Sequence, residues 1–339
     1  MKTTDFDYHL PPERIAQTPV EPRHASRLLV VDRGKADLVH TTFWNIGDYL
    51  RPGDLLVINQ TRVIPARIFA RKPTGGRIEV LLLRRENENT WEALVGGKKM
   101  KPGSRLTVEG GPDAEVIAAL EGSRRVIRFE GALEPLLEQI GQMPLPPYIH
   151  TRLENPERYQ TVYAVRPGSA AAPTAGLHFT PELMEALRGR GIEFTSLTLH
   201  VGLDTYAPVT EDDPETHQIH TEWCELTPAA AEQINAARAR GGRVIAVGTT
   251  SVRTLETAAR RAAPGQVVAP FAGPTDLFIL PGFEFKAVDA MVTNFHLPKS
   301  TLLMLVSAFA GRERMLSVYQ SAIDAGYRFF SFGDAMLIL

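Results

Sequence analysis

The chain has 339 residues, of which 44% are apolar and 22% charged, so it is long enough for two domains with a sizeable core. It has no apolar run of about 18 residues and no apolar signal-peptide segment, so we expect neither a membrane span nor secretion, and a cytoplasmic location. The single cysteine, Cys224, excludes an intrachain disulfide and a cysteine-based metal site. We interpret it as a small buried residue.

The charge is unevenly distributed. The formal net charge is −2, which excludes a protein that is basic throughout. Residues 59–128, however, hold 14 Lys and Arg against 8 Asp and Glu, a local excess of +6 that leaves −8 for the rest. Such a segment is either an electrostatic footprint for a phosphate backbone or the ordinary solvated surface of a β-structure.

The first 148 residues predict strands. Near-continuous Leu, Val and Ile runs indicate buried strands at 27–32 and 54–59. Short alternating runs separated by glycine turns then recur at regular spacing, which favours a small β-barrel. Its six expected strands are 66–71, 77–83, 91–95, 105–108, 114–120 and 126–129. A short helix over 133–140 and a stiff proline-rich linker at 143–148 follow.

From residue 149 onward strands and helices alternate, which predicts an α/β layer structure. The expected strands are 159–165, 193–201, 223–226, 243–247, 277–280, 287–293 and an edge strand at 328–331. The expected helices are 181–190, 228–240, 249–261, 301–310 and 315–325, with Thr180 and Thr227 as N-caps. We therefore expect a discontinuous mixed α/β main domain, residues 1–58 and 149–339, with a small β-barrel domain inserted at 59–148.

An uncharged stretch at 168–180 is built mostly from Ala, Gly, Ser and Thr and carries one imidazole, His178. Small residues let a ligand approach the backbone closely. The alternative interpretation is a packing turn between sheet and helix, and composition alone favours that alternative.

Two further loops precede helices at the ends of expected strands, where open α/β sheets bind ligands. Residues 248–253 combine a helix start, suited to a carboxylate or phosphate, with Arg253, which offers a bidentate contact. Residues 294–300 bring Asn294, His296 and Lys299 ahead of an apolar helix. Each loop has an equally good structural interpretation as a capped helix. Neither the P-loop nor the dinucleotide-binding pattern is present at 248–253.

A third candidate is the cluster His217, His220 and Glu222, which has the residue types of a metal site. Pro214 and the strand-like run after the cluster favour an extended geometry over a helical one. The same histidines suit proton transfer near neutral pH or hydrogen bonding to a hydroxylated ligand.

Nine segments together resemble the S-adenosylmethionine:tRNA ribosyltransferase-isomerase family of the queuosine pathway. They are residues 6–11, 52–59, 144–149, 159–164, 171–179, 198–202, 247–250, 293–300 and 332–335. The resemblance spans the whole chain in order. The chain departs from the family pattern at three places. His24 and Gln60 stand where the family usually has Asp. After the His-Val-Gly run, residues 203–206 read Leu-Asp-Thr-Tyr where the family usually has Gly-Thr-Phe.

The resemblance implies a transferase-isomerase that moves the ribosyl part of S-adenosylmethionine onto 7-aminomethyl-7-deazaguanine at the tRNA wobble position. The products are epoxyqueuosine-tRNA, adenine and methionine. S-adenosylmethionine is then a consumed substrate, with no cofactor and no metal implied, and we expect a monomer. The resemblance also implies a fold with an α/β domain and an inserted β-barrel, in agreement with the strands and helices expected from the sequence.

The implied chemistry assigns roles to the candidate residues. The base that removes the acidified C5′ proton is His178, His296 or His220. Thr249, Thr250 and Arg253 hold the methionine carboxylate, Asn294 and Glu222 bind ribose hydroxyls, and Lys299 assists adenine departure or contacts phosphate. Thr174 and Gly176 form the wall of the S-adenosylmethionine pocket. The residues expected to contact the tRNA backbone are Arg62, Arg67, Arg71, Lys98, Lys99 and Lys101.

Two other functions compete with this interpretation. One is a metal-dependent hydrolase built on the histidine and glutamate cluster. The other is an RNA-binding module without activity, which would not bind S-adenosylmethionine.

Overall fold

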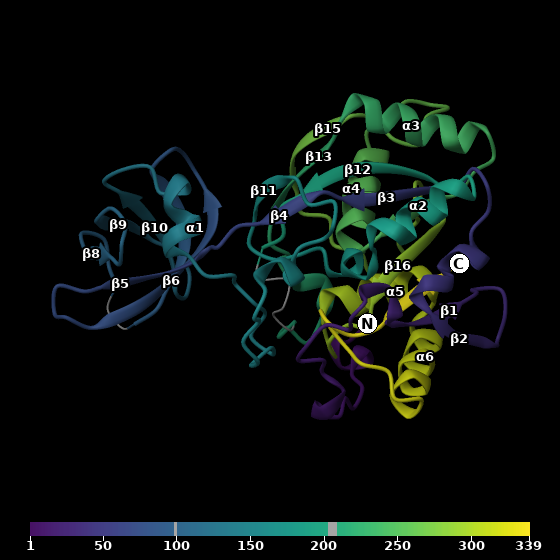
Figure 1. Ribbon diagram of the computed structural model, residues 1–339, viewed down its shortest axis with the longest axis horizontal. Coiled ribbons are helices and arrows are strands. Elements are labelled where there is room, and N and C mark those ends of the chain that lie inside the picture. Colours follow the sequence, from purple (N-terminus) through teal and green to yellow (C-terminus); the bar gives the residue numbers. More distant parts are fainter. Residues whose placement is uncertain (98–99, 203–208) are drawn as a thin grey trace. The chain divides into compact units, whose positions relative to one another are not determined.

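The computed structural model describes residues 1–97, 100–202 and 209–339, which form two compact units (Figure 1). The α/β unit comprises Met1–Thr61, Pro146–Arg166 and Pro173–Leu339, and the barrel unit comprises Arg62–Leu145 and Pro167–Ala172. The domain boundaries expected from the sequence stay a prediction. Within the described ranges, no helix is long and apolar enough to cross a membrane.

The α/β unit is built on a sheet that has nine strands among the described residues, in the order β15-β13-β12-β3-β14-β16-β17-β1-β2. The strands are β1 (Arg27–Val31), β2 (Leu38–Thr42), β3 (Leu55–Asn59), β12 (Glu193–Leu199), β13 (Glu222–Leu226), β14 (Val244–Val247), β15 (Phe271–Thr275), β16 (Ala290–Asn294) and β17 (Ala335–Ile338).

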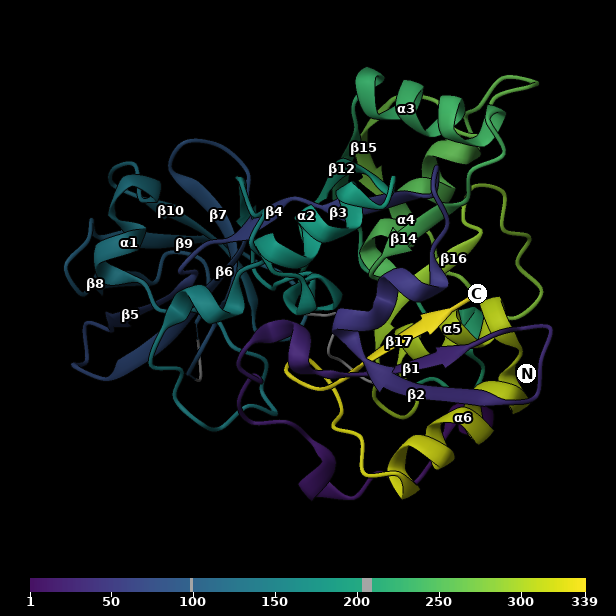
Figure 2. The same cartoon turned by 45° about the vertical axis from the view of Figure 1, so that its right-hand side comes forward.

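Strand directions bring several loops to one edge of this sheet. Strands β12, β3, β14 and β16 are parallel, whereas β17 and β1 run the opposite way. The carboxyl ends of the first four strands therefore lie at the same edge of the sheet as the amino ends of β17 and β1. Figure 2 shows β17 and β1 side by side. We call this edge the site edge.

Both faces of the sheet are covered, because alternate residues of each central strand enter different cores. In β3, Leu55 and Val57 pack with residues of α3, α4, α5 and α6. Leu56 and Ile58 pack on the other face with α2 and the short helix at Phe43–Tyr49. The helices are α2 (Pro181–Gly189), α3 (Pro228–Ala239), α4 (Thr249–Ala259), α5 (Thr301–Ala310) and α6 (Arg312–Asp324).

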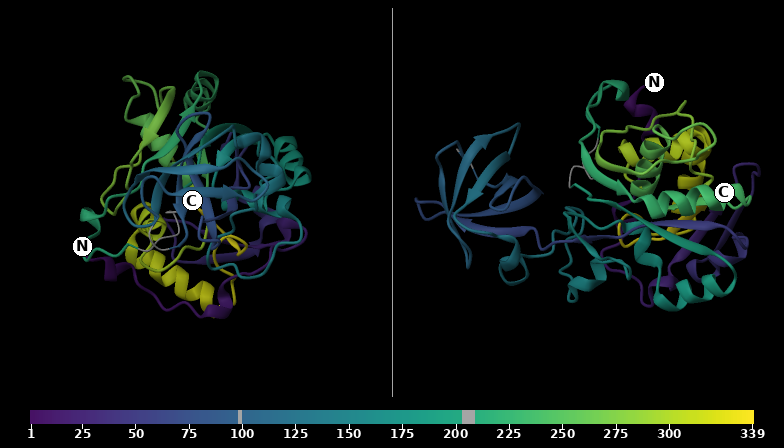
Figure 3. Two further views of the ribbon diagram at one scale, coloured as in Figure 1. Left: turned by 90° about the vertical axis from the view of Figure 1, so that its left-hand side faces the viewer. Right: turned by 90° about the horizontal axis from the view of Figure 1, so that it is seen from above.

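The barrel unit contains a closed barrel with the strand order β10-β7-β6-β5-β8-β9, drawn in blue in the right-hand view of Figure 3. Its strands are β5 (Arg67–Arg71), β6 (Arg77–Arg85), β7 (Thr90–Val95), β8 (Arg105–Val108), β9 (Ala114–Ala119) and β10 (Arg124–Phe129). The short helix α1 (Leu137–Ile140) follows, and β4 (Thr61–Val63) pairs with β11 (Arg166–Ser169). The expected fold class, an α/β structure with a small barrel, is confirmed.

Three expected strands are wrong. Residues 159–165 form local turns, in which the N–H of Gln160 bonds to Glu157 O and that of Ala164 to Thr161 O. Residues 277–280 leave the sheet because the hydroxyl of Thr275 accepts the N–H of Leu277 (3.3 Å). In both segments local hydrogen bonds outcompete strand propensity.

The third error concerns residues 328–331, which were expected to form an edge strand. Phe330 has φ 69°, a left-handed conformation that no strand contains, and the N–H of Phe329 bonds to Arg14 O. The last strand is instead β17, and it lies inside the sheet between β16 and β1.

Candidate active site

The site edge gathers polar side chains that are far apart in the sequence. Asn59 ends β3, Asn294 ends β16, and α4 begins directly after β14. The buried amide of Asn59 bonds to the backbone of Leu199 through both its oxygen (3.1 Å) and its nitrogen (3.0 Å). Its nitrogen also donates to the hydroxyl of Thr250 (3.2 Å). Asn59 thereby fixes the start of α4 against the end of β12.

The N-terminus of α4 has no side-chain cap, because its N-cap residue is Gly248 at φ 89°. By contrast, Thr180 accepts the N–H of Leu183 at α2, and Thr227 caps α3 in the same way, as expected. A helix of 11 residues with an uncapped start presents N–H donors and partial positive charge. This end of α4 is therefore suited to an anionic group.

Arg253 lies one turn into α4, on the same face as Thr249, and helical side chains lean toward the N-terminus. The residue is 7% exposed, and its guanidinium forms an ion pair with Glu222 and donates from Nε to Leu277 O (3.0 Å). Glu222 is held in turn by the N–H of Gly202 (2.9 Å). Among the described residues the buried Nη2 of Arg253 has no hydrogen-bond partner, so one strong donor is left for a ligand.

His178 is buried in the short helix η7 (Thr174–His178), against the ring of Phe43. Its Nδ1 lies 2.7 Å from the hydroxyl of Ser26, and its Nε2 lies 3.2 Å from Nδ2 of Asn294. The same Asn294 nitrogen donates to the carbonyl of Phe330 (3.1 Å).

This network determines the tautomer of His178. A carbonyl only accepts hydrogen bonds, so the Asn294 atom facing Phe330 is the amide nitrogen. That nitrogen also only donates, so Nε2 of His178 carries the lone pair and Nδ1 carries the proton. Burial, with smaller effects from Arg328 and Arg23, lowers the pKa of His178 to about 3. The imidazole is thus neutral, and both ring nitrogens are occupied.

His296 and Lys299 lie in the loop between β16 and α5. Nε2 of His296 bonds to the hydroxyl of Thr293 (2.8 Å), and burial lowers the pKa of His296 to about 3. The Tyr319 hydroxyl accepts its backbone N–H (3.0 Å), so the loop is tightly held. Lys299 is partly exposed and forms an ion pair with Asp7 (2.7 Å).

The uncharged stretch includes a packing turn. A Cβ at Gly176 would overlap the hydroxyl of Tyr163, so glycine is required there by a neighbouring side chain. Thr174 donates to Oδ1 of Asn294 (3.4 Å). A Cβ added to Gly248 would lie 3.6 Å from the Cβ of Ala175. Helix η7 therefore lies near the N-cap of α4 at one end and carries His178 at the other.

The histidine and glutamate cluster is not assembled as a metal site. His217 pairs with Glu211 (2.9 Å), Glu222 pairs with Arg253, and the exposed His220 lies in the loop before β13. In the part of the chain that the structure describes, no group of three or more His, Cys, Asp and Glu is placed to bind a metal. Cys224 is buried, and burial raises its pKa to about 11.

Several basic residues expected to contact tRNA are engaged on the barrel itself. Arg67 pairs with Glu79 (3.0 Å), and Arg71 pairs with Glu109 (3.5 Å). Lys101 is exposed. Lys98 and Lys99 lie outside the described residues, as does Asp204, which departs from the family pattern.

The two other departures have structural partners. His24 bonds to the hydroxyl of Thr180 (2.9 Å), the N-cap of α2. Gln60 donates to the hydroxyl of Thr198 (3.3 Å) and accepts from Ser196 (3.0 Å). At both positions a side chain that hydrogen-bonds to a hydroxyl stands in place of the usual carboxylate.

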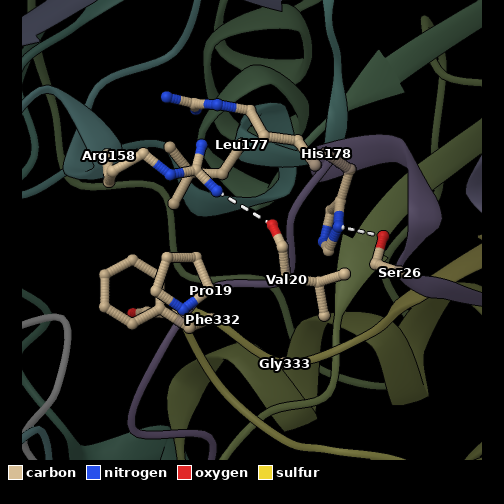
Figure 4. A pocket seen from close by; sticks show the side chains of 10 residues that line it. Pro19, Val20, Ser26, Arg158, Leu177, His178, Phe332 and Gly333 are labelled. Carbon is tan, nitrogen blue, oxygen red and sulfur yellow. Dashed lines mark hydrogen bonds between the residues drawn. The ribbon is translucent and has the colours of Figure 1, made fainter.

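Sequence reasoning missed Asn59, Ser26 and the arginines of a pocket beside His178 (Figure 4). Arg23 and Arg158 line this pocket together with Ser26 and Phe332. Asn59 falls inside one of the segments that carried the resemblance and Arg158 lies next to another, whereas Arg23 and Ser26 lie outside them. Only the fold, however, brings Ser26 within reach of a histidine 152 residues away.

A sheet covered on both faces, with polar loops at the carboxyl ends of its parallel strands, is typical of α/β enzymes, which commonly bind their ligands at that edge. The family described as queuosine biosynthesis protein matches residues 3–338. The chain therefore belongs to that family, and the resemblance found in the sequence is confirmed.

Individual relatives agree over the full length. An S-adenosylmethionine:tRNA ribosyltransferase-isomerase of Symbiobacterium thermophilum is 58% identical, with all of both chains covered. An enzyme of the same name from Thermus thermophilus is 54% identical, with 98% of each covered. The crystal structure of an S-adenosylmethionine tRNA ribosyltransferase from Thermotoga maritima is 43% identical with a TM-score of 0.58, covering 99% of this chain and 100% of that one.

The buried neutral histidines predict a pH-dependent stability. The pKa of His178 is about 3 when folded and ordinarily about 6.5, so between these values the unfolded chain binds a proton that the folded chain does not. Its contribution is complete above pH 6.5 and is lost as pH falls toward 3, by roughly 1.4 kcal/mol per pH unit. Urea unfolding at pH 7 and pH 5 should show a smaller loss of stability in His178→Gln than in the native chain. Equal losses would contradict the neutral imidazole.

Proposed function

We propose that the chain transfers and isomerises the ribosyl moiety of S-adenosylmethionine onto 7-aminomethyl-7-deazaguanine at the wobble position of tRNA. The products are epoxyqueuosine-tRNA, adenine and methionine. Family membership over the whole chain supports the reaction. The structural observation that carries it is the uncapped start of α4 beside the unsatisfied donor of Arg253, a binding place for the carboxylate of an amino-acid ligand.

In this proposal the methionine carboxylate binds the N–H groups of Thr249 and Thr250 and the Nη2 of Arg253. Glu222 orients Arg253, and its contact with ribose hydroxyls stays a prediction, as does that of Asn294. Thr174 and Gly176 contribute backbone wall, with Gly176 also serving the packing of Tyr163. Lys299, which pairs with Asp7, assists adenine departure or contacts a phosphate.

The base that removes the C5′ proton is assigned to His220. Acid–base catalysis is most efficient when the pKa of the catalytic group lies near the working pH. Burial places His178 and His296 far below that range, and the lone pair of His178 already accepts a hydrogen bond from Asn294. His220 is exposed and close in sequence to Glu222. His178 and His296 then act as positioning residues.

The tRNA partner is the anticodon stem-loop that carries the deazaguanine base, with its unstacked base as the recognised feature. We retain Arg62, Arg67, Arg71, Lys98, Lys99 and Lys101 as backbone contacts. Arg67 and Arg71 share their charge with glutamates, so we assign the larger contribution to the lysines. S-adenosylmethionine is a substrate and no cofactor is needed. The monomeric state and cytoplasmic location are further parts of the proposal.

The reaction is tested by incubating the purified chain with S-adenosylmethionine and tRNA that carries the deazaguanine base. The expected products are adenine and methionine in equal amounts, formed only with that tRNA. Formation of S-adenosylhomocysteine would indicate a methyltransferase instead. Absence of any product, with no binding of S-adenosylmethionine, would favour an RNA-binding module.

The carboxylate site predicts a selective effect of Arg253→Lys. Lysine keeps the charge beside Glu222 but loses the planar fork, so the Kd for S-adenosylmethionine should rise about 10-fold. Calorimetric titration measures this value, and thermal unfolding checks the fold. The matched control is Arg261→Lys, just beyond the other end of α4, where the guanidinium donates to Thr257 O (3.1 Å). An Arg253→Lys chain that binds S-adenosylmethionine normally would refute the site.

The base assignment predicts different outcomes for three substitutions. His220→Gln should lower the single-turnover rate at least about 100-fold without weakening S-adenosylmethionine binding. His178→Gln and His296→Gln should reduce the rate less. A His220→Gln chain with a normal rate, alongside an inactive His178→Gln chain, would reverse the assignment.

A further inference from the structure

The pocket beside His178 lies at the carboxyl end of η7, where Leu177 and His178 line it. Its cavity volume is about 20 Å³, room for about one water-sized group, and Ser26, Arg23, Arg158 and Phe332 are among the residues lining it. Figure 4 shows two of the hydrogen bonds around it, from Arg158 to Val20 and between His178 and Ser26. None of the described residues lining this pocket carries a carboxylate.

Ser26 contributes a directed donor. Nδ1 of His178 carries a proton, as the contact with Asn294 requires, so the Ser26 oxygen accepts that hydrogen bond. The hydroxyl proton of Ser26 must therefore point to another group. No second partner for this oxygen occurs among the described residues, although the side chain is only 3% exposed. A buried donor of this kind is costly unless a ligand or a water satisfies it.

Arg158 and Arg23 contribute positive charge. Nη2 of Arg158 lies 2.9 Å from Val20 O and 2.8 Å from the carboxylate of Glu21. The side chain of Glu21 is 73% exposed. Arg23 donates to the carbonyls of Gln160 (2.6 Å) and Glu157 (3.0 Å). Burial and, to a smaller extent, the neighbouring Arg158 lower the pKa of Arg23 to about 10, while Glu21 and Glu157 act in the opposite direction.

We propose that this pocket binds a phosphodiester oxygen of the tRNA backbone next to the modified nucleotide. Ser26 donates a hydrogen bond to it, and Arg158 supplies charge and further N–H donors. His178 and Asn294 position Ser26. The inference rests on the proposed function for the identity of the ligand. Helix η7 would then separate two anion sites, one for the methionine carboxylate at α4 and one for the nucleic acid.

The test uses the full chain and an anticodon stem-loop that carries the deazaguanine base, with Kd measured at several salt concentrations. Arg158→Gln should raise the Kd about 10-fold and lower the slope of log Kd against log salt by about 0.7, the value for one phosphate contact with a single strand. Ser26→Ala should weaken binding without changing the slope, because it removes a neutral donor. The control is Arg240→Gln, in an ion pair with Glu193 (2.8 Å) at the amino end of β12, which should change neither.

A second experiment distinguishes a tRNA phosphate from the carboxylate of S-adenosylmethionine as the ligand of this pocket. Stem-loops with one neutral methylphosphonate at each loop position should reveal a position that weakens the native chain but not Arg158→Gln. The Kd for S-adenosylmethionine should be unchanged in both pocket variants. An unchanged salt slope in Arg158→Gln, or weaker S-adenosylmethionine binding with normal stem-loop binding, would overturn the phosphate site. Release of adenine by the native chain tests the proposed function separately.

Discussion

The amide of Asn294 is the interaction on which the site depends. It ends β16, and its nitrogen donates both to the carbonyl of Phe330 and to Nε2 of His178. One orientation of the amide thus fixes a backbone carbonyl, a histidine tautomer and, through His178, the direction of the Ser26 hydroxyl. The left-handed conformation of Phe330 aims its carbonyl at this amide, and strain of this kind is often found at functional sites.

Because Asn294 occupies the Nε2 lone pair of His178, this histidine positions its neighbours and does not act as the catalytic base. A buried imidazole with both nitrogens engaged is a good positioning group and a poor base. The start of α4 needs no imidazole at all, because backbone N–H groups and Arg253 supply the donors. Helix η7 lies near both places, because Ala175 is close to Gly248 and His178 bonds to Ser26. Gly176 is the small residue in η7 that packing requires, because a Cβ there would overlap Tyr163.

Much of this arrangement is predictable from the sequence. The barrel strands, the capped helices α2 and α3, and the two loops at the ends of β14 and β16 follow from periodicity and turn residues. The segments 159–165 and 328–331 were mistaken for strands because their aromatic residues fit that propensity, whereas tertiary packing decides their conformation. Asn59 and Ser26 could not be recognised, because their roles depend on partners more than 130 residues away. The pairing of Arg67 and Arg71 with glutamates was equally invisible.

The tautomer of His178 tests the account most directly. Nitrogen-15 NMR of the histidine side chains, with the signal assigned by its loss in His178→Gln, distinguishes a protonated from an unprotonated ring nitrogen. We expect a neutral ring with the proton on Nδ1 and an unprotonated Nε2 that accepts the hydrogen bond from Asn294, unchanged from pH 7.5 to pH 5. A proton on Nε2, or titration of the ring near pH 6.5, would contradict it.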